Sequence, residues 1–88
     1  MRAILLWNEQ TDYASEVREW LGDFEHDTGK GSRLEQLDPE TMEGSDFAKT
    51  YDILQYPAVL ILDEDDGRVL KMWKGTPMPQ IDEVSYWV

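Results

Sequence analysis

Hydrophobic residues form two short continuous runs in this chain, Ala3–Trp7 and Ala58–Leu62, each bordered by polar residues. A run of this length that is apolar at every position is typical of a strand buried on both faces, as the central strands of a covered sheet are. We therefore predict that these two runs form the middle of a sheet.

The stretch after the first run has hydrophobic residues at helical spacing, which predicts an amphipathic helix. We expect Thr11 or Asp12 to cap its N-terminus and Gly29 to end it, because these residue types favour those positions. The apolar positions of this helix are Val17, Trp20, Leu21 and Phe24.

The middle of the chain is more polar. Arg33–Leu37 is short and half polar, which favours an edge strand, and a turn is expected over Asp38–Glu40. A second helix is predicted over Ser45–Asp52, with Ser45 or Asp46 as its cap. Its inward residues should be Phe47, Ala48 and Tyr51.

The last third of the chain contains a turn signal, Asp65–Gly67, between two strand patterns. Val69–Trp73 should therefore return antiparallel to the preceding strand. Gly75 and Pro77 interrupt the pattern, and Pro79 is expected at the first position of a short final helix through Ile81 and Val84. The predicted architecture is one α/β domain over residues 1–88, a three-layer sandwich of order β-α-β-α-β-β-α around a four-stranded mixed sheet.

Composition excludes several functions. The chain has no cysteine, so dithiol exchange, disulfides and cysteine-based zinc sites are ruled out. Its formal charge is −11, which disfavours nucleic acid and anionic membranes as partners. No apolar run is long enough to cross a membrane, and we expect a cytoplasmic protein.

Candidate catalytic and metal sites are weak. Asp63–Gly67 lacks the spacing of a calcium loop and is interpreted as a hairpin turn, so no metal is expected. Ser15 has one histidine to serve as a base, His26, but eleven positions on one helix separate them by roughly 16 Å. We therefore predict no catalytic residues and no cofactor.

Several motifs resemble the thioredoxin and glutaredoxin superfamily. Phe47–Asp63, followed by Asp66–Val69 and Gly75, resembles the C-terminal half of thioredoxins, and Val17–Leu21 is similar to the first helix of glutaredoxins. The resemblance implies a thioredoxin-like fold. It also implies a cis bond before Pro57.

The resemblance further places the family's C-x-x-C motif, within one residue, at Asp12, Tyr13, Ala14 and Ser15. In the family the first thiol of this motif is acidified by the helix N-terminus. Asp12 and Ser15 would replace the two thiols, and neither side chain exchanges disulfides. The positions are therefore interpreted as a degenerate active site that serves as a helix cap.

A retained peptide-binding role is the leading functional hypothesis. In the family the residue before the cis-proline pairs through its backbone with an extended peptide, which implies this role for Tyr56 beside Pro57. If Trp7, Tyr13 and Tyr56 meet at one end of the sheet, an exposed aromatic patch there would mark the surface. The hypothesis is a non-redox domain that binds a protein or an extended peptide through this face or through an acidic face. The alternative is that the cis-proline only shapes the loop.

Two alternatives stay open at this point, together with the oligomeric state. The domain could be an enzyme or a small-ligand protein that binds glutathione or another anion at the helix N-terminus. Gly75–Pro79 departs from the glutaredoxin glutathione motif, which weakens that reading. The domain could instead be a subunit of an obligate assembly, with an interface made by Trp73, Met78, Tyr86 and Trp87.

Overall fold

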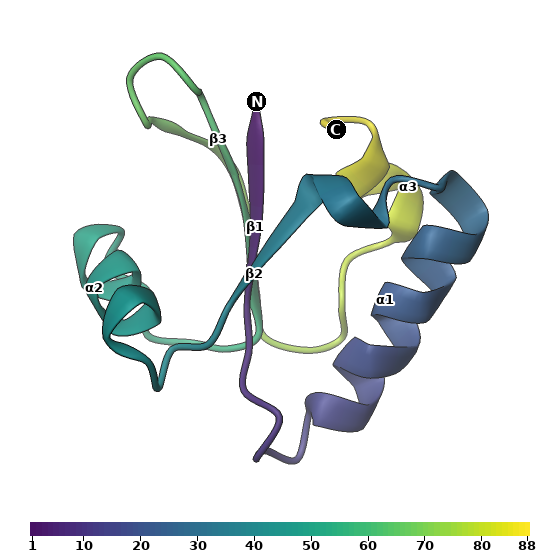
Figure 1. The fold of residues 1–88 in the computed structure, drawn as a ribbon, viewed down its shortest axis with the longest axis horizontal. Coiled ribbons are helices and arrows are strands. Elements are labelled where there is room, and N and C mark those ends of the chain that lie inside the picture. Colours follow the sequence, from purple (N-terminus) through teal and green to yellow (C-terminus); the bar gives the residue numbers. More distant parts are fainter.

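A computed structural model describes all 88 residues and contains four strands and three α-helices (Figure 1). The elements, in chain order, are β1 (Arg2–Leu6), α1 (Ala14–Thr28), β2 (Leu34–Leu37), α2 (Met42–Thr50), β3 (Ala58–Leu62), β4 (Val69–Lys74) and α3 (Ile81–Ser85). A 3₁₀ turn over Gly31–Arg33 precedes β2.

The strands form one mixed sheet in the order β2-β1-β3-β4. β1 pairs in parallel with β2 and antiparallel with β3, and β3 pairs antiparallel with β4. The two continuous apolar runs therefore occupy the centre of the sheet, and the half-polar strand lies at its edge. The predicted α/β class and four-stranded mixed sheet are confirmed.

The sheet is covered on both faces. α1 and α3 lie on one face and α2 lies on the other (Figure 1). Because successive side chains of a strand point to opposite faces, the central strands divide their residues between two cores. Leu5 and Ile61 pack with the α1 and α3 side chains, whereas Ile4 and Leu60 pack with α2.

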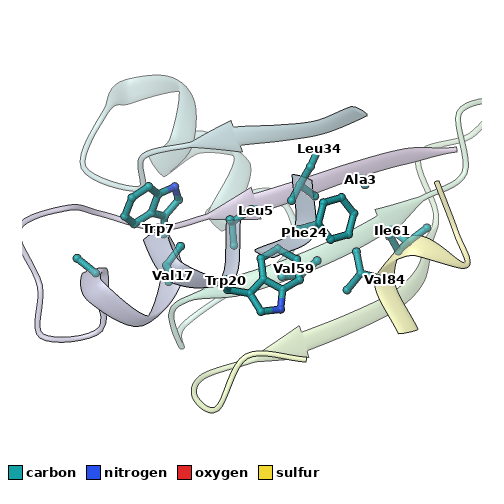
Figure 2. Packing of buried hydrophobic residues seen from close by; sticks show 11 residues of the cluster. Ala3, Leu5, Trp7, Val17, Trp20, Phe24, Leu34, Val59, Ile61 and Val84 are labelled. Atoms are coloured by element: carbon teal, nitrogen blue, oxygen red, sulfur yellow. The ribbon is translucent and has the colours of Figure 1, made fainter. Parts of the chain in front are cut away.

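The core beneath α1 and α3 is the larger one. Trp20 and Phe24 of α1 point toward the central strands, and Val84 of α3 joins them (Figure 2). The Trp20 and Phe24 rings are stacked with their centroids 5.1 Å apart. Burial of each large apolar side chain contributes about 1.5–3 kcal/mol, so these contacts hold the two helices on the sheet.

Of the two predicted ends of α1, the C-terminal end is confirmed and the N-terminal end is not. Gly29 ends it in the left-handed conformation, with φ of 67°, as predicted. The predicted cap at Thr11 or Asp12 is wrong, because the helix begins at Ala14 after Tyr13 and no side chain caps it. The Thr11 hydroxyl instead donates to the Asn8 carbonyl at 2.7 Å, which closes the preceding loop.

The other two helices also begin elsewhere than predicted. α2 starts at Met42, not Ser45, because the Thr41 hydroxyl accepts the Gly44 N–H at 3.1 Å and so provides an earlier cap. Pro79 lies before α3, whose N-cap is Gln80, and not in its first turn.

The acidic segment between β3 and β4 forms the predicted turn. The Asp63 carboxylate accepts the Asp65 N–H, and the Asp66 carboxylate accepts the Arg68 N–H, both at 2.9 Å. Gly67 supplies a positive φ of 73°. Both carboxylates therefore accept hydrogen bonds from the backbone of the turn itself.

No helix is long and apolar enough to span a membrane.

Candidate functional site

Three connections meet at one end of the sheet (Figure 1). The β1–α1 loop, residues 7–13, starts beside the segment that enters β3, because Leu6 pairs with Ala58. The β4–α3 connection, residues 75–80, starts there as well, because Ala58 also pairs with Lys74. The topology thus gathers the positions that the sequence singled out.

Asn8 organises the β1–α1 loop. Its backbone N–H donates to the Tyr13 hydroxyl at 3.0 Å, and its side-chain oxygen accepts the Gln10 N–H at 2.7 Å. Its side-chain amide donates to Asp38 at 2.9 Å, which ties the loop to the end of β2. With the bond from Thr11 to its carbonyl, all of the polar groups of Asn8 have partners inside the protein.

Asp38 is the charged partner in this network. The hydrogen bond from Asn8, and secondly the bond from the Glu40 N–H at 2.8 Å, lower the pKa of Asp38 from its ordinary value. Sequence reasoning missed both Asn8 and Asp38. A signal existed, since an asparagine or aspartate directly after a strand often bonds to nearby backbone.

The four positions that resemble the C-x-x-C motif lie around the start of α1. Tyr13 is the N-cap and Ala14 is buried, whereas Asp12 and Ser15 are exposed. The side chains of Asp12 and Ser15 make no hydrogen bond or ion pair within the protein. Neither residue acts as a cap.

His26 does not approach these positions. Its side chain is 89% exposed near the other end of α1, where its Nδ1 lies 3.2 Å from the Asp27 carboxylate. Since a serine needs an adjacent base to act as a nucleophile, His26 cannot serve Ser15 in that role.

The segment before β3 has a different character. The Tyr56–Pro57 peptide bond is cis, Pro57 is buried, and the Pro57 carbonyl accepts the Gly75 N–H at 2.8 Å. The Tyr56 N–H and carbonyl make no hydrogen bond within the protein. A half-exposed residue therefore carries an unpaired backbone donor and acceptor beside a fixed proline.

The Tyr56 side chain packs on the face of the sheet that α2 covers. Its hydroxyl donates to the Ile53 carbonyl at 3.3 Å, and its ring packs against the core under α2. Burial raises the pKa of Tyr56, and the negative charges of Tyr13, when ionised, and Glu40 raise it further.

Trp7 does not contribute to an exposed aromatic patch. It is 8% exposed and belongs to the core under α1, and its indole N–H donates to the Gln36 side chain at 3.0 Å. Trp7 and Tyr56 thus pack on opposite sides of the sheet. Of the three aromatics considered from sequence, Tyr13 and Tyr56 are the pair that remains partly exposed.

No protein-family model matches the chain, and no curated protein matches it by sequence. Its structure is similar to that of thioredoxin 1 from the thermophilic eubacterium Thermosipho africanus TCF52B. The TM-score is 0.62 at 17% sequence identity, and the match covers 96% of this chain and 85% of that one. The chain therefore has a thioredoxin-like fold, and it has this fold without any cysteine.

Proposed function

We propose that this domain is a non-redox binding module that holds an extended peptide segment of a protein partner against Tyr56. The observation that carries the proposal is the unpaired N–H and carbonyl of Tyr56. An extended peptide lying antiparallel or parallel to this residue would pair with both groups, as in β-strand addition.

The surroundings of Tyr56 support this mode of binding. The buried Pro57 and the bond from Gly75 to its carbonyl fix the backbone on one side of Tyr56. Two residues earlier, Leu54 is 87% exposed and gives a peptide side chain an apolar contact. A preorganised backbone loses less conformational entropy on binding, so a short pairing of this kind can hold a ligand.

The start of α1 supports binding without chemistry. Thiolate exchange needs a sulfur nucleophile, and the chain has none. The exposed Asp12 and Ser15 make no hydrogen bond that would activate them, and the histidine His26 lies near the other end of α1. A carboxylate at Asp12 also repels anionic ligands from this helix end, which argues against glutathione.

The proposal is tested by selecting binders from a random decapeptide library and mapping the enriched peptides by NMR on the labelled domain. We expect amide shifts at Leu54–Tyr56 and nuclear Overhauser contacts between the peptide backbone and Tyr56. Leu54→Asp should weaken binding at least fivefold. Tyr86→Asp is the matched control, because Tyr86 is an equally exposed apolar residue (82%) on α3's C-terminal side.

Two results would contradict the proposal. One is the absence of any enriched peptide, or shifts that avoid Tyr56. The other is a set of shifts at Asp12–Ser15 on titration with millimolar glutathione, which would favour the small-ligand alternative instead.

A further inference from the structure

A groove runs along α1 on the side that faces the β4–α3 connection and α3. It consists of two hollows of about 260 Å³ and 600 Å³, and Trp20 lines both of them. The indole N–H of Trp20 donates to the Pro79 carbonyl at 2.7 Å, which fixes the β4–α3 connection against α1. The groove lies apart from Tyr56, which is not among its lining residues.

One wall of the groove is a straight row of carboxylates on α1. Glu16, Glu19, Asp23 and Asp27 follow one another at intervals of three, four and four residues, which places them on one stripe of the helix. The stripe is about 16 Å long at 1.5 Å per residue. Asp82, in the first turn of α3, adds a carboxylate to the opposite wall.

These charges have no cationic partner of their own among the lining residues, which include no lysine or arginine. None of Glu19, Asp23 and Asp82 takes part in an ion pair. Glu16 accepts the Met78 N–H at 2.9 Å, and Asp27 lies 3.2 Å from the exposed His26 ring. At the rim, Lys30 Nζ lies 3.5 Å from the Ser85 carbonyl. The lining of the groove therefore carries a net negative charge.

The floor between the walls is apolar. Trp20 is 7% exposed with its one donor already used, and Met78, Pro79 and Ile81 are partly exposed beside it. The floor therefore offers apolar contact with no unused side-chain hydrogen-bond donor. Apolar side chains would fill it, and cations on either side of them would meet the carboxylates.

We propose that this groove binds a basic amphipathic helix of a protein partner. A helix of about eleven residues has the length of the acidic stripe, and lysine or arginine at the same three- and four-residue intervals would face it. Apolar residues on its inner face would rest on Trp20, Met78 and Ile81. The opposite charges would raise the association rate and set the register of binding.

The probe is a synthetic amphipathic 14-residue peptide with a leucine face bordered by four lysines. Titration into the labelled domain should shift the amides of Glu19, Asp23 and Ile81 and the indole N–H of Trp20. A peptide with glutamate in place of lysine should not bind. A peptide with alanine in place of leucine should bind at least fivefold more weakly.

The matched variants are Glu19→Gln with Asp23→Asn, and Glu43→Gln with Asp46→Asn on α2. Both pairs remove two negative charges, but α2 covers the opposite face of the sheet (Figure 1). We expect the α1 pair to weaken peptide binding at least tenfold and the α2 pair less than twofold.

Three outcomes would overturn the proposal. The first is no shift in the groove up to millimolar peptide. The second is equal weakening by the two variant pairs, which would mean attraction to net charge alone. The third is a shift of groove amides with protein concentration in the absence of peptide, which would assign the groove to a second copy of this chain.

Discussion

Two loops at the same end of the sheet treat their polar groups in opposite ways. In the β1–α1 loop, Asn8 bonds through both backbone groups and both side-chain groups to residues of this chain. In the segment before β3, the Tyr56 N–H and carbonyl have no internal partner. The same end of the fold is therefore closed by internal hydrogen bonds in one loop and open in the other.

The difference shows that two loops at one end of a sheet can be held in place by different means. Internal hydrogen bonds hold the β1–α1 loop in place, and the side chains of Asp12 and Ser15 take no part in them. The segment at Tyr56 is held instead by its neighbours, through the buried Pro57 and the bond from Gly75. The first loop is held by hydrogen bonds between its own polar groups. The second segment is held by the residues that follow it, so the backbone N–H and carbonyl of Tyr56 remain free for a ligand.

The largest effect should come from breaking the closed loop with Asn8→Ala. The substitution removes the side-chain hydrogen bonds to Asp38 and Gln10, each worth about 1 kcal/mol, so the free energy of unfolding should fall by about 2 kcal/mol. Urea denaturation measures it. Gln10→Ala is the control, because the Gln10 side chain makes no hydrogen bond, and it should change stability by less than about 0.5 kcal/mol. Equal effects of the two substitutions would contradict the role of Asn8.

The next prediction concerns Gly75, whose N–H donates to the Pro57 carbonyl and so helps to hold the segment at Tyr56. Gly75→Ala should lower the free energy of unfolding by about 1–2 kcal/mol, because Gly75 has φ of 77° and a Cβ there would collide with the Gln55 side chain. Gly22→Ala is the matched control. Its Cβ would meet no atom within 4 Å, and alanine in a helix should stabilise by about 0.5–1 kcal/mol. Denaturation that shows the same sign for both would contradict this reading.

Tyr13→Phe tests whether a residue of the β1–α1 loop affects the ionisation of Tyr56. It removes the acceptor of the Asn8 N–H and should cost about 1 kcal/mol. It should also lower the pKa of Tyr56, because the charge of ionised Tyr13 contributes to raising it. An ultraviolet titration of tyrosine ionisation measures the shift. Tyr86→Phe, at a residue that is 82% exposed and makes no side-chain hydrogen bond, should leave both quantities unchanged.

The sequence predicted what depends on local pattern. Ala58–Leu62 forms β3 with the predicted bounds, and Gly29 ends α1, because an apolar run and a left-handed glycine are decided by neighbouring residues. The starts of the helices were wrong because several residue types can cap a helix and the tertiary contacts choose among them. The Thr11 hydroxyl donates to the Asn8 carbonyl and does not cap α1. The Thr41 hydroxyl accepts the Gly44 N–H, so α2 begins before Ser45.

The candidate site was less accessible to sequence reasoning for the same physical reason. The bond between Asn8 and Asp38 joins residues 30 positions apart, and it exists because β1 and β2 pair in parallel and end together. The acidic stripe on α1 is visible in the sequence, but its apolar floor is not. That floor depends on the β4–α3 connection, which the Trp20–Pro79 contact places beside α1.

The smallest effect concerns the pH dependence of the closed loop. The pKa of Asp38 is lowered from 3.8 in the folded protein, so its charged form stabilises the fold. This stabilisation is fully present above pH 3.8 and is lost as the pH falls through the lower folded-state value. Asp38→Asn keeps the acceptor oxygen but has no charge to lose. The wild type should therefore exceed the variant in urea midpoint at neutral pH, and the difference should disappear in strong acid.

Asp12→Asn controls for the removal of one negative charge, because the Asp12 carboxylate makes no hydrogen bond. Midpoints measured across the acid range separate the two cases. A difference between wild type and Asp38→Asn that stays constant into strong acid would mean that the amide changes the loop geometry and that the Asp38 charge is not what closes it. The contrast between the two loops would then depend on Asn8 alone. A difference that disappears would place the charge of Asp38 among the forces that keep the β1–α1 loop closed while Tyr56 stays open.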